Sequence, residues 1–145
     1  MSAAELPTMY ELCLMHARAD RAMRSVVTKQ LDAYQLTMME WLALAVIAKG
    51  PKKGLSMSQV AQTLDVTLPQ VTALVSGLLK TNYVRQQVLA ADRRGRQVVA
   101  TLKGKRLLTK LEDSVSKAMR TWSQDIDREQ LQSYITVVYQ LGQID

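Results

Sequence analysis

Residues 56–104 carry the pattern that most constrains the fold of this chain. Apolar residues recur at helical spacing over 56–64 and again over 67–80, and only a short turn separates the two stretches. Two strand candidates follow at 84–89 and 97–102, with a basic cluster between them. This order predicts a helix, a tight turn, a second helix and a β-hairpin with a basic tip.

Local signals support both helices. Ser56 and Gln59, like Thr67 and Gln70, have the spacing of a capping box, in which each side chain satisfies a free backbone N–H at a helix start. Asn82 can adopt the left-handed backbone that ends a helix. The second helix is therefore expected to bury one apolar stripe and to expose the opposite polar face. The stripe comprises Val71, Leu74, Val75, Leu78 and Leu79.

Positive charge is concentrated in the same part of the chain. The net charge is +6, yet residues 51–110 hold 11 Lys and Arg against 2 Asp and Glu, so the remainder is net negative. Three of these cations lie in the cluster Asp92-Arg93-Arg94-Gly95-Arg96. A localised basic surface favours a polyanion such as DNA as the partner, whereas the alternative is a solvated basic face.

The composition is that of a folded chain, since 48% of the residues are hydrophobic. The longest apolar run, Trp41 to Ala48, is far shorter than the roughly 20 residues of a membrane-spanning helix, so no membrane contact is expected. No apolar leader is visible, so we expect no signal peptide. Cys13 is the single cysteine and cannot form an intrachain disulfide, which favours a reducing cytoplasm.

Further helices are expected on both sides of the central segment. Residues 6–36 have the spacing of one long helix with Pro7 in its first turn. Thr37 and Glu40 form a third capping box, which starts a buried helix ending at Lys49. Two more helices are expected to close the chain. One begins near Thr101 and the other covers about 127–141, and their apolar stripes are Leu107, Leu108, Leu111, Val115, Met119 and Trp122, then Leu131, Ile135, Val138 and Leu141.

These terminal stripes exceed what the small central module can cover. Each apolar side chain left exposed forfeits about 1.5–3 kcal/mol, so we expect a second copy to cover them in a symmetric homodimer. The alternative is a monomer whose terminal helices fold back on one another. We expect a single domain over 1–145, mainly α-helical with a small β-hairpin. Residues 37–104 would form its nucleic-acid-binding part, and the helices of 6–36 and 105–145 its dimerisation part.

The chain resembles the MarR family of bacterial transcriptional regulators over nearly its whole length. The residues that carry the resemblance are Val71-Thr72, Leu74-Val75, Leu78 and Val84, then Asp92-Arg93-Arg94 and Thr101-x-Lys103-Gly104. The resemblance implies a winged helix-turn-helix homodimer, with a repressor as the favoured role. Such a dimer would bind a pseudo-palindromic operator in double-stranded DNA and leave it when a small ligand binds or when the protein is oxidised.

The chain departs from the family pattern on the expected recognition helix. Ala73 stands where the family often has Arg, and Ser76-Gly77 stands where it has a charged pair. The hairpin arm Val88-Leu89-Ala90-Ala91 is apolar where the family's is usually charged. These changes remove base readers and phosphate contacts. The alternative function is therefore a winged-helix protein-interaction module with weak or lost operator reading.

Roles in DNA binding follow from placing the second helix in the major groove, N-terminal end first. Gln70, Thr72, Ala73 and Ser76 are the candidate base readers, with Gln70 pairing with adenine through two hydrogen bonds and Ala73 touching a thymine methyl. Candidate phosphate contacts are Ser56, Ser58, Thr67 and Lys80. In the hairpin, Arg96 is a further candidate DNA contact, either Arg93 or Arg94 is expected in the minor groove, and Asp92 would orient a neighbouring arginine.

The family resemblance also implies a pocket for a small aromatic or other apolar effector between the dimer helices and the winged part. Candidate lining residues are Met9, Tyr10, Cys13, His16, Met38 and Trp41, for each of which core packing is the alternative. Cys13 is either a redox sensor or a buried inert thiol. We expect no metal, cofactor or catalysis, because one Cys and one His are too few for zinc and no nucleophile elbow, P-loop or dinucleotide-binding glycine motif is present.

Overall fold

Helices and one β-hairpin make up the described part of the chain. This computed structural model describes residues 7–89 and 92–143, with the backbone alone at 89 and 92–94. In chain order the elements are α1 (Met9–Leu31), the 3-10 turn η1 (Asp32–Tyr34), α2 (Met38–Lys49), α3 (Met57–Leu64), α4 (Leu68–Lys80), β1 (Val84–Leu89), β2 (Asp92–Ala100), α5 (Leu102–Trp122) and α6 (Arg128–Leu141).

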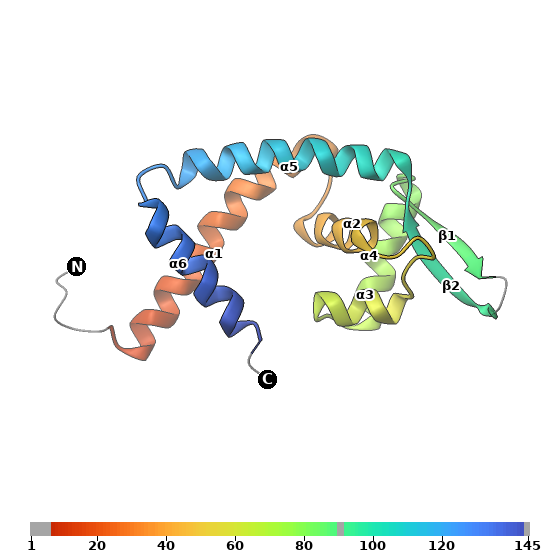
Figure 1. Cartoon of the computed structure of the whole chain (residues 1–145), viewed down its shortest axis with the longest axis horizontal. Coiled ribbons are helices and arrows are strands. Elements are labelled where there is room, and N and C mark those ends of the chain that lie inside the picture. Colours follow the sequence, from red (N-terminus) through yellow and green to blue (C-terminus); the bar gives the residue numbers. More distant parts are fainter. Residues whose placement is uncertain (1–6, 90–91, 144–145) are drawn as a thin grey trace.

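The long helix α5 joins two groups of elements (Figure 1). α1 and α6 lie at its C-terminal end, whereas α2, α3, α4 and the hairpin lie at its N-terminal end. The predicted fold class, mainly α with a small β-hairpin wing, is confirmed. Among the helices of the described residues, none is both long enough and apolar enough to cross a membrane.

Capping boxes begin α2, α3 and α4, as the sequence predicts. The start of α1 differs from the prediction because Thr8 and Glu11 form a capping box of their own, so Pro7 precedes the helix. The Thr8 hydroxyl and backbone N–H both donate to the Glu11 carboxylate, and these hydrogen bonds hold the pKa of Glu11 below its ordinary value. The predicted helix over 6–36 is also too long, since α1 ends at Leu31 and η1 follows, closed by Gln35 with φ of 52°.

The turn between α3 and α4 lies where the sequence places it. Asp65 has φ of 52°, and its N–H donates to the carbonyls of Ala61 and Gln62. The Val66 N–H also donates a hydrogen bond to the Ala61 carbonyl at 3.1 Å. Thr67 is the next residue and caps the start of α4. Beyond α4, Asn82 has φ of 59°, the left-handed conformation expected of it. These local bonds fix the angle at which α4 leaves α3.

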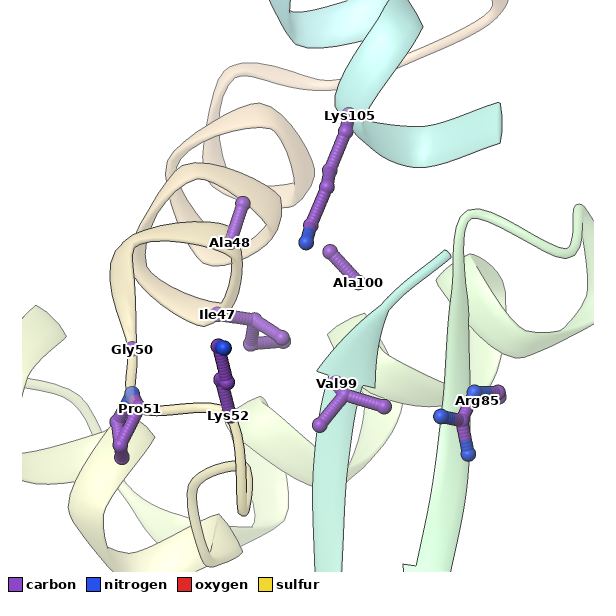
Figure 2. Close-up of a pocket in the computed structure, with 9 residues that line it drawn as sticks. All are labelled: Ile47, Ala48, Gly50, Pro51, Lys52, Arg85, Val99, Ala100 and Lys105. Atoms are coloured by element: carbon purple, nitrogen blue, oxygen red, sulfur yellow. The ribbon is translucent and has the colours of Figure 1, made fainter. Parts of the chain in front are cut away.

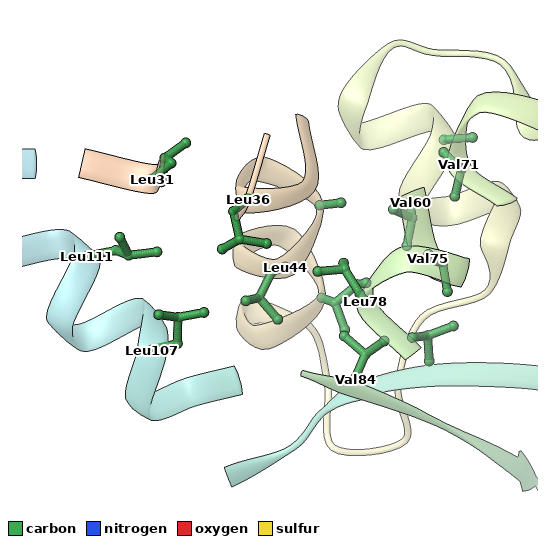
Figure 3. Packing of buried hydrophobic residues seen from close by; sticks show 14 of the residues in the cluster. Leu31, Leu36, Leu44, Val60, Val71, Val75, Leu78, Val84, Leu107 and Leu111 are labelled. Atoms are coloured by element: carbon green, nitrogen blue, oxygen red, sulfur yellow. The ribbon is translucent and has the colours of Figure 1, made fainter. Parts of the chain in front are cut away.

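One apolar core holds α4 against its neighbours (Figure 3). Val71, Val75 and Leu78, three residues of the predicted stripe, have no exposed surface. The other buried residues come from the surrounding elements: Val27, Leu31, Leu36, Ala43, Leu44, Ile47, Val60, Ala61, Val84, Val98, Leu107, Leu111 and Val115. Fully burying a side chain of this size contributes about 1.5–3 kcal/mol, so the orientation of α4 is strongly determined and its polar face is directed outward.

The second strand of the hairpin begins earlier than the sequence predicts. β2 covers Asp92–Ala100 rather than 97–102, and Leu102 belongs to α5. Pairing continues past Gln97 because an exposed arginine does not interrupt a backbone ladder: Val88 pairs with Arg96 and, after a bulge, Leu89 pairs with Asp92. The basic cluster therefore lies within a strand and not in the connecting loop.

A short segment before α3 adds a third pairing to the hairpin. Leu55 and Val98 exchange backbone hydrogen bonds of 3.1 and 2.8 Å. The Gln87 amide donates to the carbonyls of Lys52 and Lys53, at 3.2 and 2.7 Å. The turn that leads into the helix-turn-helix is thereby fixed to the wing.

Candidate nucleic-acid interface

The exposed face of α4 carries the side chains that the sequence singles out. Gln70, Thr72, Ala73 and Ser76 are all exposed, on the side of the helix opposite its buried stripe. Because the core fixes that stripe, these four side chains form one polar surface over the first nine residues of α4. A polar helical face of this kind is suited to hydrogen bonding with base edges.

The amide of Gln70 is already partly engaged. Its Oε1 atom accepts hydrogen bonds from the Thr67 backbone N–H and from the Thr67 hydroxyl, both at 2.9 Å. A two-bond pairing with adenine uses the amide oxygen as an acceptor and the amide nitrogen as a donor. Such a pairing would have to break the capping box, whereas single donation from Nε2 would leave it intact. The sequence predicts both uses of the Gln70 amide, and the structure shows that its oxygen is already used in the cap.

The remaining side chains of the face differ in what they can offer. The Thr72 hydroxyl donates to the Leu68 carbonyl at 2.9 Å, so it presents an acceptor and a methyl group to its surroundings. Ala73 presents only a methyl group. Ser76 is exposed and carries a hydroxyl that can donate or accept. Over the first nine residues of α4 the face therefore combines weak polar groups with apolar contacts and contains no cation.

Two of the residues predicted to contact phosphate already use their side-chain oxygens in helix caps. Ser56 Oγ accepts from the Gln59 N–H at 3.2 Å, and Thr67 is bonded to Gln70 as described. Ser58 and Lys80 are exposed. Lys80 lies ten residues after Gln70, and at 1.5 Å per residue this places it about 15 Å farther along the helix. It would therefore meet a different stretch of any backbone that lies beside the N-terminal end of α4.

The wing places basic residues in a strand next to α4. Arg96 is exposed and pairs across the ladder with Val88. The backbones of Asp92, Arg93 and Arg94 continue β2, but their side chains lie outside the described residues. The expected minor-groove contact of Arg93 or Arg94, and the orienting role of Asp92, therefore stay predictions.

Comparisons with known proteins agree with this geometry. A model of the MarR family matches residues 34–95. The HTH-type transcriptional regulator PrsX of Escherichia coli is 28% identical over 94 residues, which cover 65% of this chain and 55% of that protein. The chain thus spans little more than half the length of this curated relative. Residues 34–95 of the chain are therefore similar to the MarR family of regulators.

Solved structures show the same fold over almost the whole chain. A MarR-family transcriptional regulator from Rhodococcus sp. RHA1 is similar, with a TM-score of 0.81 and 20% identity over 94% of this chain and 96% of that one. A point mutant of S. aureus MepR, solved bound to an oligodeoxyribonucleotide, has a TM-score of 0.65 and 17% identity over 93% of this chain and 96% of that one. The winged helix-turn-helix fold of the MarR family is therefore present here.

The MarR-like motif Thr101-x-Lys103-Gly104 has a structural explanation. Thr101 caps α5 and its hydroxyl donates to the Asn82 carbonyl at 2.7 Å. Lys103 Nζ donates to the Thr81 carbonyl at 2.8 Å and lies 4.9 Å from the centre of the Tyr83 ring. A Cβ at Gly104 would overlap the Tyr83 carbonyl oxygen. The motif thus locks the end of α4 and the base of the wing onto α5, a positioning role that spacing alone did not reveal.

The predicted effector pocket is not assembled within one chain. Met9, Tyr10, Cys13 and His16 lie exposed on the N-terminal half of α1, so the expectation of a buried Cys13 thiol is wrong for the single chain. This half of α1 extends away from the winged part (Figure 1). Met38 is half-buried, and its sulfur accepts a hydrogen bond from Arg24 at 3.4 Å.

Trp41 lines a separate cavity of about 380 Å³ between α2 and α5. Its other lining residues are Ala45, Lys49, Leu108, Thr109, Glu112 and Asp113. Within the described residues, no group of three His, Cys, Asp or Glu side chains is placed to hold a metal ion.

Proposed function

We propose that this protein is a sequence-specific DNA-binding transcriptional regulator that works as a homodimeric repressor. The observation that carries the proposal is the juxtaposition of an outward polar face on α4 with a basic wing, in the part of the chain that holds the excess positive charge. Residues 37–104 would then be the DNA-binding part and the helices of 6–36 and 105–145 the dimerisation part. Together they would form one domain over 1–145.

In the proposed complex α4 enters the major groove and the wing lies over the adjacent minor groove. Gln70 would donate from Nε2 to a base acceptor while its oxygen keeps the cap, and Ala73 would contact a thymine methyl. Thr72 and Ser76 would make the other base contacts. Arg96, together with Arg93 or Arg94, would lie along the minor groove, whose potential favours cations. Ser58 and Lys80 would position the protein on phosphates.

The apolar face of α6 supports the homodimer. Ile135, Val138 and Leu141 of the predicted stripe are 51%, 41% and 59% exposed in the single chain, and Tyr139 is 68% exposed. α1 adds Met9, Tyr10, Leu12 and Met15 to the exposed apolar side chains at the same end of the molecule. A monomer with folded-back helices would cover these residues, whereas they lie exposed in the single chain. A second copy related by a two-fold axis would cover them and place two recognition helices on one duplex.

Release from DNA is proposed to follow effector binding or oxidation. The Trp41 cavity has the size of a small-molecule site and lies where α2 of the winged part meets α5. An aromatic or other apolar effector seated there would shift α2 relative to α5 and with it α4. Oxidation of the exposed Cys13 is the second route. Release by peroxide that persists in a Cys13→Ser variant would eliminate the oxidative route.

The test is binding of the purified protein to the DNA upstream of its own gene, compared with random DNA, over a salt series. A specificity ratio above about 10³ supports an operator-binding regulator. Affinity that falls steeply with salt and is equal on both duplexes favours a protein-interaction module. Two observations support the protein-interaction module as the second candidate function. The hairpin arm over 88–91 is apolar in sequence, and the first nine residues of α4 carry no cation.

A further inference from the structure

A hollow of about 170 Å³ lies at the base of the wing, away from the outward face of α4. Three cationic side chains line it, Lys52 from the α2–α3 turn, Arg85 from β1 and Lys105 from α5. In Figure 2 the ammonium groups of Lys52 and Lys105 both reach into the space beside Ile47, while Arg85 stands beyond Val99 at the rim. Three separate segments of the chain thus each contribute a cation to the lining of this hollow.

The backbone around this hollow is fixed before any ligand arrives. The turn that carries the first cation is tied to the wing by the Leu55–Val98 pairing and by the Gln87 amide. The start of α5, which carries the third cation, is tied to the wing base by a 3.0 Å hydrogen bond from the Thr101 N–H to the Tyr83 carbonyl. A ligand would therefore lose little free energy to ordering the chain.

The charge around the hollow is not balanced from within. No acidic side chain is among its lining residues, and in the described part of the chain none of the three cations forms a salt bridge. The C-terminal end of α2 contributes partial negative charge equivalent to about half an elementary charge. This offsets only a small part of three positive charges, so the hollow attracts an anion.

We propose that Lys52, Arg85 and Lys105 form a binding site for a small oxyanion, with a phosphate group as the ligand. The volume is several times the roughly 30 Å³ that a water molecule occupies in the liquid, so a phosphate and a few bridging waters fit. Arg and Lys side chains are the usual partners of phosphate oxygens, through short charge-assisted hydrogen bonds. By contacting all three cations, the ligand would bridge the α2–α3 turn, the wing and α5.

The position of the site assigns the phosphate to a free small molecule. α4 has 13 residues, so its C-terminal end, which leads to the wing base, is about 18 Å from its N-terminal end. Arg85 precedes Leu89 by four residues of strand, which places it about 13 Å from the outer end of β1. The site is thus distant from both parts that would enter the grooves of DNA.

The first experiment titrates inorganic phosphate into the full chain by calorimetry at constant ionic strength. We expect saturable binding of one phosphate per chain, weakened about tenfold or more in Lys52→Gln and in Lys105→Gln. Lys110→Gln is the matched control, because Lys110 is an exposed cation of α5 that does not line the hollow. Binding that is absent, does not saturate, or falls equally in the control would overturn the site.

The second arm distinguishes a free phosphate from a phosphate of the DNA backbone. All three variants are titrated with one random duplex. Equal affinities, together with selective loss of phosphate binding, support a free ligand. A selective loss of duplex affinity in Lys52→Gln and Lys105→Gln would assign the hollow to the DNA backbone and overturn the free ligand. The phosphate titration contains no DNA, so its outcome is independent of operator binding.

Discussion

The same substitution, glycine to alanine, is predicted to cost more stability in α5 than in α4. Gly104 is buried, and a Cβ there would overlap the Tyr83 carbonyl oxygen and lie 3.2 Å from a methyl group of Leu44. At Gly77 the nearest atom is one carboxylate oxygen of Glu40 at 2.6 Å. The other oxygen of Glu40 accepts hydrogen bonds from Thr37 in the α2 capping box, so this side chain can yield only by straining that cap. The chemistry is identical, so the surroundings decide the size of the effect.

The expected magnitudes follow from these contacts. Alanine gains up to about 1 kcal/mol over glycine inside a helix. At Gly104 this gain is outweighed by an overpacking cost of about 1–3 kcal/mol and by strain on the hydrogen bond between the Thr101 N–H and the Tyr83 carbonyl, worth about 1 kcal/mol. Gly104→Ala is expected to lose about 1–3 kcal/mol of unfolding free energy. Gly77→Ala is expected to change it by no more than about 1 kcal/mol, because strain on the Glu40 cap offsets the gain in helix propensity.

Guanidinium unfolding measures both values. It is done at one fixed protein concentration, because the stability of the proposed dimer would depend on concentration. Because Gly104 holds the wing base against α5, Gly104→Ala is also expected to weaken DNA binding more than Gly77→Ala does. A Gly104→Ala protein as stable as the parent, or equal losses in the two variants, would refute the proposed contact between α5 and the wing base.

Three further outcomes are expected. Gln70→Ala weakens operator binding by about 1–3 kcal/mol in a titration, and an equal loss on random DNA would remove Gln70 as a base reader. Ile135→Glu shifts the protein from dimer to monomer in analytical ultracentrifugation, whereas Gln140→Glu, at an exposed position away from the stripe of Ile135 and Val138, leaves the dimer intact. If both variants remained dimeric, the proposed α6 interface would be contradicted. Because the folded pKa of Glu11 is lowered, its capping contribution is present above the ordinary pKa of 4.5 and is lost as pH falls below it. Amide exchange in the first turn of α1 should therefore accelerate in acid relative to the rest of α1, and Glu11→Gln should remove most of that dependence.

The elements that sequence reasoning located correctly are those set by neighbouring residues. The capping boxes at Thr37, Ser56 and Thr67 and the left-handed Asn82 involve residues within one turn of each other, so their spacing is readable. The buried stripe of α4 follows from helical periodicity alone. The same reasoning misses the start of α1, because Pro7 and the Thr8 capping box are competing signals and the side-chain bonds to Glu11 decide between them.

What the sequence could not show depends on partners distant in the chain. The extension of β2 to Asp92 requires pairing with β1, and arginines carry no strand signal. The convergence of Lys52, Arg85 and Lys105 arises only when the turn, the strand and the helix are packed together.

The most direct test of the central claim is selection of bound sequences from a pool of random duplexes by the purified protein. A dimer with one α4 per half-site predicts enrichment of two inverted half-sites whose centres lie about one helical turn apart, near 34 Å. The sequences selected by the Gln70→Ala variant should show no preference at the base pair that Gln70 contacts. A pool that shows no enrichment, or enrichment of a single unrepeated half-site, would contradict the account of a symmetric, sequence-reading regulator.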